Sequence, residues 1–177
     1  NIDPSASDAG TYTVSYTVPS TGNCSSIVAS TTVTIYPIPS ATIAGTTSAC
    51  QEADAPLITF TGSNGQAPYT FTYNINGGTN QTVTTSSGNS ITLPVPTGNP
   101  GNFTYNLVSV RDASPAACLQ VQTGSAVVTV NALPSATISG TTTVCQNAPS
   151  PLITFTGASG TVPYTFTYSV NGGTSQT

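Results

Sequence analysis

Lysine, histidine, methionine and tryptophan are absent from this chain, and Arg111 is its only basic residue. Without histidine, neither a Ser-His-Asp nor a Cys-His catalytic relay can form within these residues. Without lysine, the Lys–Asn cross-links that stiffen some bacterial stalks are excluded. A single base also excludes the basic surface that nucleic acids and anionic membranes require of a partner. The sequence therefore predicts a protein segment that is not an enzyme, needs no cofactor and binds no nucleic acid.

Charge of either sign is scarce. Charged residues are 3% of the chain, against about 25% in average soluble proteins. Low complexity can indicate disorder, but the apolar residues here recur periodically, which indicates a folded chain. No apolar run approaches the length of a membrane span, so no membrane insertion is predicted for this segment.

The few charged residues offer only weak candidates for a site. Glu52 and Asp54 could bind Ca²⁺ if a loop carbonyl and another carboxylate joined them, but a solvated loop is the favoured interpretation, and no metal site is predicted. Arg111 and Asp112 are adjacent in the chain. We expect them to form an exposed ion pair in a loop rather than an acid–base site.

An internal repeat is the feature that does most to define the chain. Residues 39–82 recur without a gap as residues 134–177, an offset of 134 − 39 = 95 residues. Residues 1–37 align, with small gaps, with the end of the same unit. The repeat predicts three modules: the C-terminal part of one in 1–37, a complete one in 38–133, and the N-terminal part of a third in 134–177. Arrays of this kind usually act through length, spacing and multivalency.

Within the module, the apolar residues alternate with threonine, serine and asparagine at a period of two, which predicts β-strands. The strands are expected at 41–51 with a break near Gly45, and at 56–62, 68–75, 80–85, 90–95, 103–110 and 125–131. The phase slips between Leu107 and Val108, which suggests a β-bulge. Pro94 lies within one strand, which is therefore expected at a sheet edge. Seven short strands in about 95 residues are typical of an immunoglobulin-like sandwich.

The alternation also predicts the core of residues 38–133. The residues expected to be mostly buried are Phe60, Tyr69, Phe71, Tyr73, Ile91, Leu93, Phe103, Tyr105, Leu107, Val128 and Val130. The aromatic row Tyr69, Phe71 and Tyr73 could instead form a platform for carbohydrate, but its alternation favours core packing. Residues 8–12 resemble the turn-Gly-x-Tyr segment that opens the sixth strand of immunoglobulin-like domains, where the tyrosine hydroxyl bonds to backbone. Phe103 stands at that place in the complete module and lacks the hydroxyl.

Two stretches of sequence carry a family resemblance: PSATIxGTTxxCQ…PLITFTG…PYTFTYxxNGG and SASDAGTYTVSYTV. They resemble the Ig-like and PKD-like repeats of large surface proteins of the Bacteroidetes. The resemblance covers essentially the whole chain but supplies no catalytic motif. The W-D-F-G-D-G-like signature of true PKD domains is missing, because the corresponding residues 73–78 read YNINGG.

The resemblance implies tandem immunoglobulin-like (PKD-like) β-sandwich modules on a bacterial cell surface, exported by type IX secretion, as in gliding or adhesion proteins. The first function it implies is structural, a stalk or filament of beads whose partners are neighbouring modules. Lateral self-association is also expected, because so few charges repel one another. One alternative is an adhesin that binds glycan or a partner cell. A second is a non-catalytic accessory array of a secreted enzyme.

Export of this kind exposes thiols to an oxidising compartment, so the cysteines are expected to be oxidised. Parity within the complete module makes Cys50 and Cys118 the first choice for a disulfide, and Cys24 and Cys145 would then pair outside the chain. In a simple immunoglobulin-like layout, however, Cys50 and Cys118 lie at opposite poles, whereas a bridge needs Cα atoms within about 7 Å. The alternatives are a bridge between modules or free thiols.

The two partial modules cannot bury their apolar faces alone, because a sandwich needs both of its sheets. Either the chain is a piece of a longer polypeptide, or the head of one copy is completed by the tail of the next. The sequence favours the first explanation, since a long array needs no special assembly, but both predict a filament.

Overall fold

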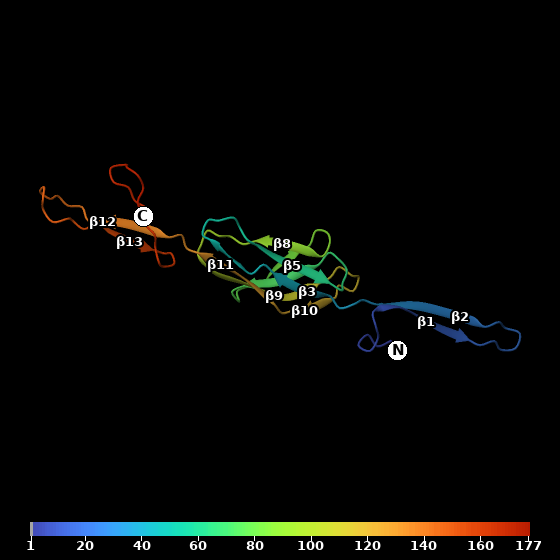
Figure 1. The fold of residues 1–177 in the computed structure, drawn as a ribbon. Coiled ribbons are helices and arrows are strands. Elements are labelled where there is room, and N and C mark those ends of the chain that lie inside the picture. Colours follow the sequence, from blue (N-terminus) through green and yellow to red (C-terminus); the bar gives the residue numbers. More distant parts are fainter. Residues whose placement is uncertain (1) are drawn as a thin grey trace. The chain divides into compact units, whose positions relative to one another are not determined.

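The structure is a computed structural model that describes residues 2–177 of the chain (Figure 1). These residues contain β-strands and no helix, so the all-β prediction is confirmed. The strands are β1 (Gly10–Val18), β2 (Ile27–Ile35), β3 (Ser40–Ala44), β4 (Thr47–Cys50), β5 (Leu57–Ser63), β6 (Thr70–Ile75), β7 (Gln81–Thr84), β8 (Ser90–Pro94), β9 (Gly101–Arg111), β10 (Leu119–Val121), β11 (Ser125–Asn131), β12 (Ser135–Ser139) and β13 (Thr154–Ala158).

The strands of residues 38–133 form two sheets. One has the order β3-β5-β8, and the other has the order β4-β11-β9-β6-β7 with β10 added to β9. The sheets share a core, since the ring of Phe60 in β5 lies 5.6 Å from that of Phe71 and 5.2 Å from that of Tyr73, both in β6. Two facing sheets with a common apolar interior are the arrangement of a β-sandwich.

Two further pairs of strands stand apart from these sheets in the pairing pattern. β1 and β2 form an antiparallel hairpin, and β12 pairs antiparallel with β13. The chain divides into two compact units. One holds residues 1–46, 57–94 and 104–127, and the other holds 47–56, 95–103 and 128–177. The module boundaries that the repeat predicts stay a prediction.

Most of the sequence-predicted strands are found within two residues of their expected ends. The break near Gly45 is real and has a steric cause. Gly45 has a φ of +120°, and a Cβ there would collide with the carbonyl oxygen of Leu57. The bulge is also confirmed, because Thr72 pairs with Ser109 while Tyr73 pairs with Leu107, which leaves Val108 without a partner in the register. The proline-containing strand β8 is at the edge of its sheet, as predicted.

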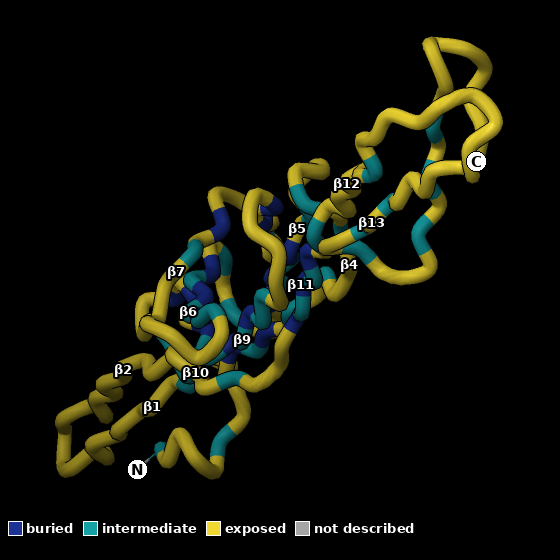
Figure 2. The backbone as a smooth tube through the Cα atoms, turned by 90° about the vertical axis from the view of Figure 1, so that its left-hand side faces the viewer, coloured by how far each residue is buried: buried dark blue, intermediate teal, exposed yellow. Residues whose placement is uncertain are grey.

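Eight of the eleven predicted core residues are buried, as the dark segments of Figure 2 show for residues 38–133. They are Phe60, Tyr69, Phe71, Tyr73, Tyr105, Leu107, Val128 and Val130. Ile91, Leu93 and Phe103 are only half-buried. Ile91 and Leu93 lie on the edge strand β8, where one flank has no neighbouring strand. Ile58, Val95 and Val110 are fully buried and were not in the predicted core.

One tyrosine–glycine contact recurs in both copies of the repeat. The Tyr69 hydroxyl donates a hydrogen bond to the Gly65 carbonyl oxygen at 2.7 Å, and its ring lies against Gly62. A Cβ at Gly62 would stand 2.6 Å from the Tyr69 ring. The equivalent Tyr164 makes the same hydrogen bond to Gly160 at 3.0 Å and lies equally close to Gly157. The second copy therefore keeps the local packing of the first.

Candidate functional site

The four cysteines are free thiols in this structure, so the predicted Cys50–Cys118 bridge is not formed. Cys50 ends β4, where it stands beside Asn131 of β11. Cys118 precedes β10, where its carbonyl oxygen accepts a hydrogen bond from the Asp112 amide and its sulfur lies 3.8 Å from the Ser114 hydroxyl. The two residues thus have different neighbours. Cys24 and Cys145 are exposed.

The carboxylates do not gather into a site. Glu52 and Asp54 are exposed, and the loop that carries them is tied to Thr97, whose hydroxyl donates to the Ala53 carbonyl oxygen at 2.6 Å. Residues 2–177 contain no group of three or more acidic, cysteine or histidine side chains positioned to hold a metal ion.

The exposed ion pair predicted for Arg111 and Asp112 is wrong. Asp112 is 4% exposed. Its carboxylate accepts one hydrogen bond from the backbone amide of Gln66 at 3.1 Å and another from the Ser114 hydroxyl at 2.9 Å. Arg111 is exposed, because successive residues at a strand end point to opposite faces. Asp112 is therefore a structural residue that fixes the β5–β6 turn.

The aromatic row forms the core, as the alternation favoured. Tyr69, Phe71 and Tyr73 are each no more than 5% exposed, and Tyr73 stacks on Tyr105 of β9 with ring centroids 6.0 Å apart. No aromatic platform for a sugar exists at these three residues.

This tyrosine pair predicts a loss of stability at alkaline pH. Burial raises the pKa of Tyr73 above its usual 10.0, and burial together with the neighbouring Tyr73 raises the pKa of Tyr105. The folded state thus holds these protons more tightly than the unfolded chain. The stabilisation is complete below pH 10 and is lost as the pH rises from 10 through the raised values. Urea unfolding followed by circular dichroism on both sides of pH 10 measures the loss, and Tyr73→Phe should reduce it. An unfolding free energy that stays constant across this range would contradict the prediction.

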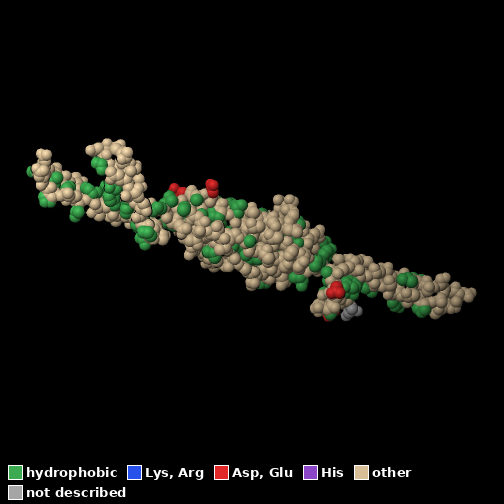
Figure 3. Space-filling view, viewed as in Figure 1, with side chains coloured by type: hydrophobic (Ala, Val, Ile, Leu, Met, Phe, Trp, Pro, Cys, Tyr) green, Lys and Arg blue, Asp and Glu red, His purple; other side chains and the backbone are tan. Residues whose placement is uncertain are grey.

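Residues 134–177 present an uncovered apolar surface, which we call the head face. It consists of Ile138, Ile153, Phe155, Phe166, Tyr168 and Val170, which line two open hollows of about 340 and 510 Å³. Figure 3 shows hydrophobic side chains at the surface of this segment. Ile153 is 52% exposed, whereas its repeat equivalent Ile58 is fully buried. The head face is thus the surface that the complete module covers.

The missing cover also changes the backbone. Residues 68–73 and 163–168 have the same sequence, PYTFTY, yet the first contributes to β6 while the second makes only an isolated bridge between Tyr168 and Gln176. The ring contacts persist, with Phe155 lying 5.6 Å from Phe166 and 5.1 Å from Tyr168. The ring contacts are therefore kept, while the backbone pairing is reduced to the bridge between Tyr168 and Gln176.

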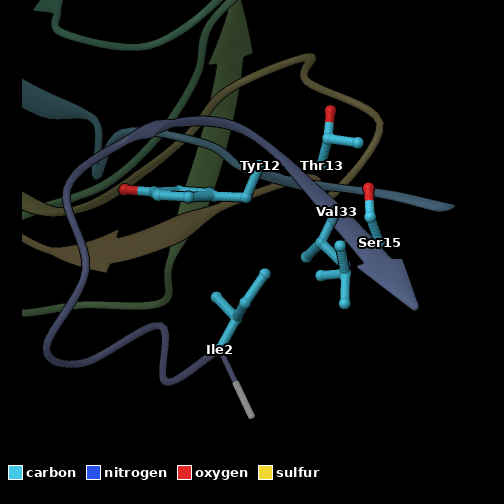
Figure 4. A pocket seen from close by; sticks show the side chains of 6 residues that line it. Ile2, Tyr12, Thr13, Ser15 and Val33 are labelled. Atoms are coloured by element: carbon cyan, nitrogen blue, oxygen red, sulfur yellow. The ribbon is translucent and has the colours of Figure 1, made fainter. Parts of the chain in front are cut away.

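The β1–β2 hairpin presents a second uncovered apolar surface, the hairpin face, made of Tyr12, Val14, Tyr16, Val33 and Ile35. These residues project to one side because Tyr12 pairs with Val33 in an antiparallel register. Figure 4 shows Ile2, Tyr12 and Val33 around an open hollow of about 660 Å³. The Tyr12 hydroxyl donates to the Asp8 carbonyl oxygen at 2.8 Å, the hydrogen bond expected of the turn-Gly-x-Tyr segment.

Comparison of the chain with protein-family models, curated proteins and solved structures gives no match.

The two uncovered faces are consequently the strongest candidates for function within residues 2–177. Both are lined mainly by apolar side chains and contain no charged side chain. The part of the chain that is described has no helix long and apolar enough to cross a membrane. Sequence reasoning found the residues of both faces by their alternation, but it missed the burial of Asp112 and the strand β10. Only the fold brings Asp112 against Gln66, and β10 is three residues long.

Proposed function

We propose that this chain is a structural segment of a long extracellular repeat protein, a stalk or filament of immunoglobulin-like, PKD-like beads on a bacterial cell surface. The observation that carries the proposal is the structural match between two copies of the repeat. The Phe60–Phe71 and Phe155–Phe166 ring pairs have the same 5.6 Å separation. An array requires a unit whose core contacts are the same in every copy.

Other features support a structural rather than a catalytic role. The chain has no histidine or lysine, and its single arginine, Arg111, is exposed. Gly62 and Tyr69, which pack closely against each other, serve the fold of the bead. The Tyr12–Asp8 hydrogen bond supports the immunoglobulin-like assignment of the first module. Location outside the cell, with export by type IX secretion, is the part that the family resemblance contributes.

Antibodies raised against this chain test the proposal on the cells that produce it. They should label intact cells, and the label should disappear when type IX secretion is disrupted. In-frame removal of one 95-residue unit should shorten the surface structure without abolishing it. Labelling confined to permeabilised cells would overturn the proposal.

An adhesin is the second candidate, favoured by one polar surface. Thr70, Thr72, Thr82, Ser109 and Arg111 line an open hollow of about 370 Å³ together with Leu119. Hydroxyl groups and one guanidinium offer hydrogen bonds to a sugar that carries a carboxylate. Binding to an array of acidic glycans that Arg111→Ala abolishes would support this candidate, and no binding to any glycan would exclude it.

A further inference from the structure

Cys50 lies where the chain leaves the complete module. It pairs with Asn131, the last residue of β11, and a short linker then leads to β12. The turn after this cysteine is the same in both copies of the repeat, since the Ala53 amide donates to the Cys50 carbonyl oxygen at 3.2 Å and the Ala148 amide donates to that of Cys145 at 3.1 Å. The repeat therefore keeps this thiol, which we call the exit thiol, in one local structure.

Cys118 lies where the chain enters the complete module. Its carbonyl oxygen accepts a hydrogen bond from the Asp112 amide at 3.1 Å. Asp112 lies close to Gly65, and so does Pro39, the last residue before β3, because a Cβ at Gly65 would stand 2.8 Å from the Asp112 Cβ and 3.0 Å from the Pro39 Cβ. Cys24, which aligns with Cys118, lies in the turn between β1 and β2, at the opposite end of that hairpin from the linker that follows it. We call this second position the entry thiol.

The exit and entry thiols of one module are too far apart to join each other. The Thr129 hydroxyl donates to the Asn102 side-chain oxygen at 2.9 Å, which places the exit thiol near the start of β9. The entry thiol lies at the far end of β9, since the residue after it, Leu119, pairs with Arg111. A strand rises about 3.4 Å per residue, so Asn102 and Arg111 lie about 30 Å apart along β9. A disulfide needs Cα atoms within about 7 Å.

A junction between two modules offers each thiol a nearer partner. Only residues 132–134 separate β11 of the complete module from β12 of the next. Three residues span at most about 11 Å, so the exit end of one module stays close to the entry end of the following one. Each junction thus has an exit thiol on one side and an entry thiol on the other. Both are accessible, because Cys50 is exposed and Cys118 is half-buried.

We propose that Cys50 forms a disulfide with the entry thiol of the following module, and that Cys118 forms one with the exit thiol of the preceding module. Each bridge forms by exchange with a small-molecule disulfide. One S–S bond joins the two protein sulfurs, and their two protons and two electrons pass to the reagent, whose own S–S bond breaks to give two thiols. The second covalent connection at each junction limits how far neighbouring beads swing about the linker.

The inference deepens the proposed function and rests on it, because the repeat array supplies the neighbouring modules. Location outside the cell supplies the oxidising compartment in which such bridges persist.

Peptide mapping of the protein as its cells produce it tests the proposal. The protein is isolated without reductant after its free thiols have been blocked with N-ethylmaleimide. Pepsin then digests it at acid pH, where thiols are protonated and exchange is slow, and mass spectrometry identifies the linked peptides. The Cys50 peptide should be joined to the entry cysteine of the following module, and the Cys118 peptide to the exit cysteine of the preceding one. The sequences after two successive exit thiols, QEADAP and QNAPSP, distinguish neighbouring modules.

Two serine variants of the full protein serve as controls for each other. Cys50→Ser should leave one reactive thiol, at the entry position of the following module, while Cys118 stays bridged. Cys118→Ser should leave one at the exit position of the preceding module, while Cys50 stays bridged. A bridge within the module would instead free Cys118 in the first variant and Cys50 in the second.

Three results would overturn the inference: a peptide that joins Cys50 to Cys118, a peptide that joins either cysteine to any other partner, or N-ethylmaleimide on both cysteines of the unmodified protein. Mapping of the unmodified protein decides between these results even where a variant does not fold. The proposed function fails separately. Free thiols in a protein that antibodies label on intact cells would remove the bridges and keep the surface array. Bridged modules in a protein that is labelled only after permeabilisation would keep the bridges and remove the surface location.

Discussion

Replacing Phe60 by alanine is expected to lower the free energy of unfolding of the sandwich in residues 38–133 by about 4 kcal/mol. The Phe60 ring is fully buried and contacts the rings of Phe71 and Tyr73 at 5.6 and 5.2 Å. Its removal leaves a cavity between two sheets that hydrogen bonding holds at their spacing, so the site cannot collapse to fill it. Urea unfolding followed by circular dichroism measures the change.

The repeat supplies a control for this substitution. Phe155→Ala removes the equivalent ring, which makes the same contacts with Phe166 and Tyr168 but is only half-buried. At concentrations where the chain is a monomer, Phe155→Ala should leave the main unfolding transition nearly unchanged, because part of the Phe155 ring is already in contact with water. If Phe60→Ala and Phe155→Ala lowered the free energy of unfolding equally, the second sheet that covers Phe60 would contribute nothing to stability at this position.

Gly62→Ala is expected to destabilise the same sandwich by about 3 kcal/mol, although it adds a single methyl group. The new Cβ would lie 2.6 to 2.9 Å from three atoms of the Tyr69 ring. Tyr69 cannot move away easily, since it is 1% exposed and its hydroxyl is bonded to both the amide and the carbonyl of Gly65. The strain must therefore be taken up by the backbone or by the loss of these hydrogen bonds.

Gly98→Ala is the matched control, because a Cβ at Gly98 meets no atom within 4 Å and its φ is not in the left-handed region. Its midpoint of unfolding in urea should equal that of the unmodified chain. If Gly62→Ala also left the midpoint of unfolding unchanged, the close approach of Tyr69 would not constrain the fold.

The strands of residues 38–133 were predictable because threonine-rich alternation and turn residues act locally. The break at Gly45, the bulge at Val108 and the edge position of Pro94 each follow from a single residue or a slip of phase. The burial of Asp112 was not predictable, because its partner Gln66 is 46 residues away in the chain. An aspartate at a strand end is usually solvated. Only the folded chain brings the backbone amide of Gln66 close enough to donate a hydrogen bond to the Asp112 carboxylate.

Residues 163–168 mark the limit of local reasoning most clearly. Their sequence is identical to that of 68–73, so any prediction from local sequence assigns both the same structure. The structure differs because β9 and β7 lie beside one copy and leave the other with a single bridge. The residues of the head face and hairpin face were visible in the alternation, whereas their exposure depends on which neighbours the fold provides.

Amide hydrogen exchange at these two identical segments is the most direct test of the account, whose central claim is that a covering hairpin turns this sequence into a strand. In dilute solution, the amides of Thr70 and Thr72, which by strand alternation point to the same edge as the Asn76 amide that donates to Thr104 of β9, should exchange more than about 100-fold more slowly than those of Thr165 and Thr167. An opening free energy of about 3 kcal/mol already gives that factor. Equal protection of the two segments in the dilute monomer would contradict the account.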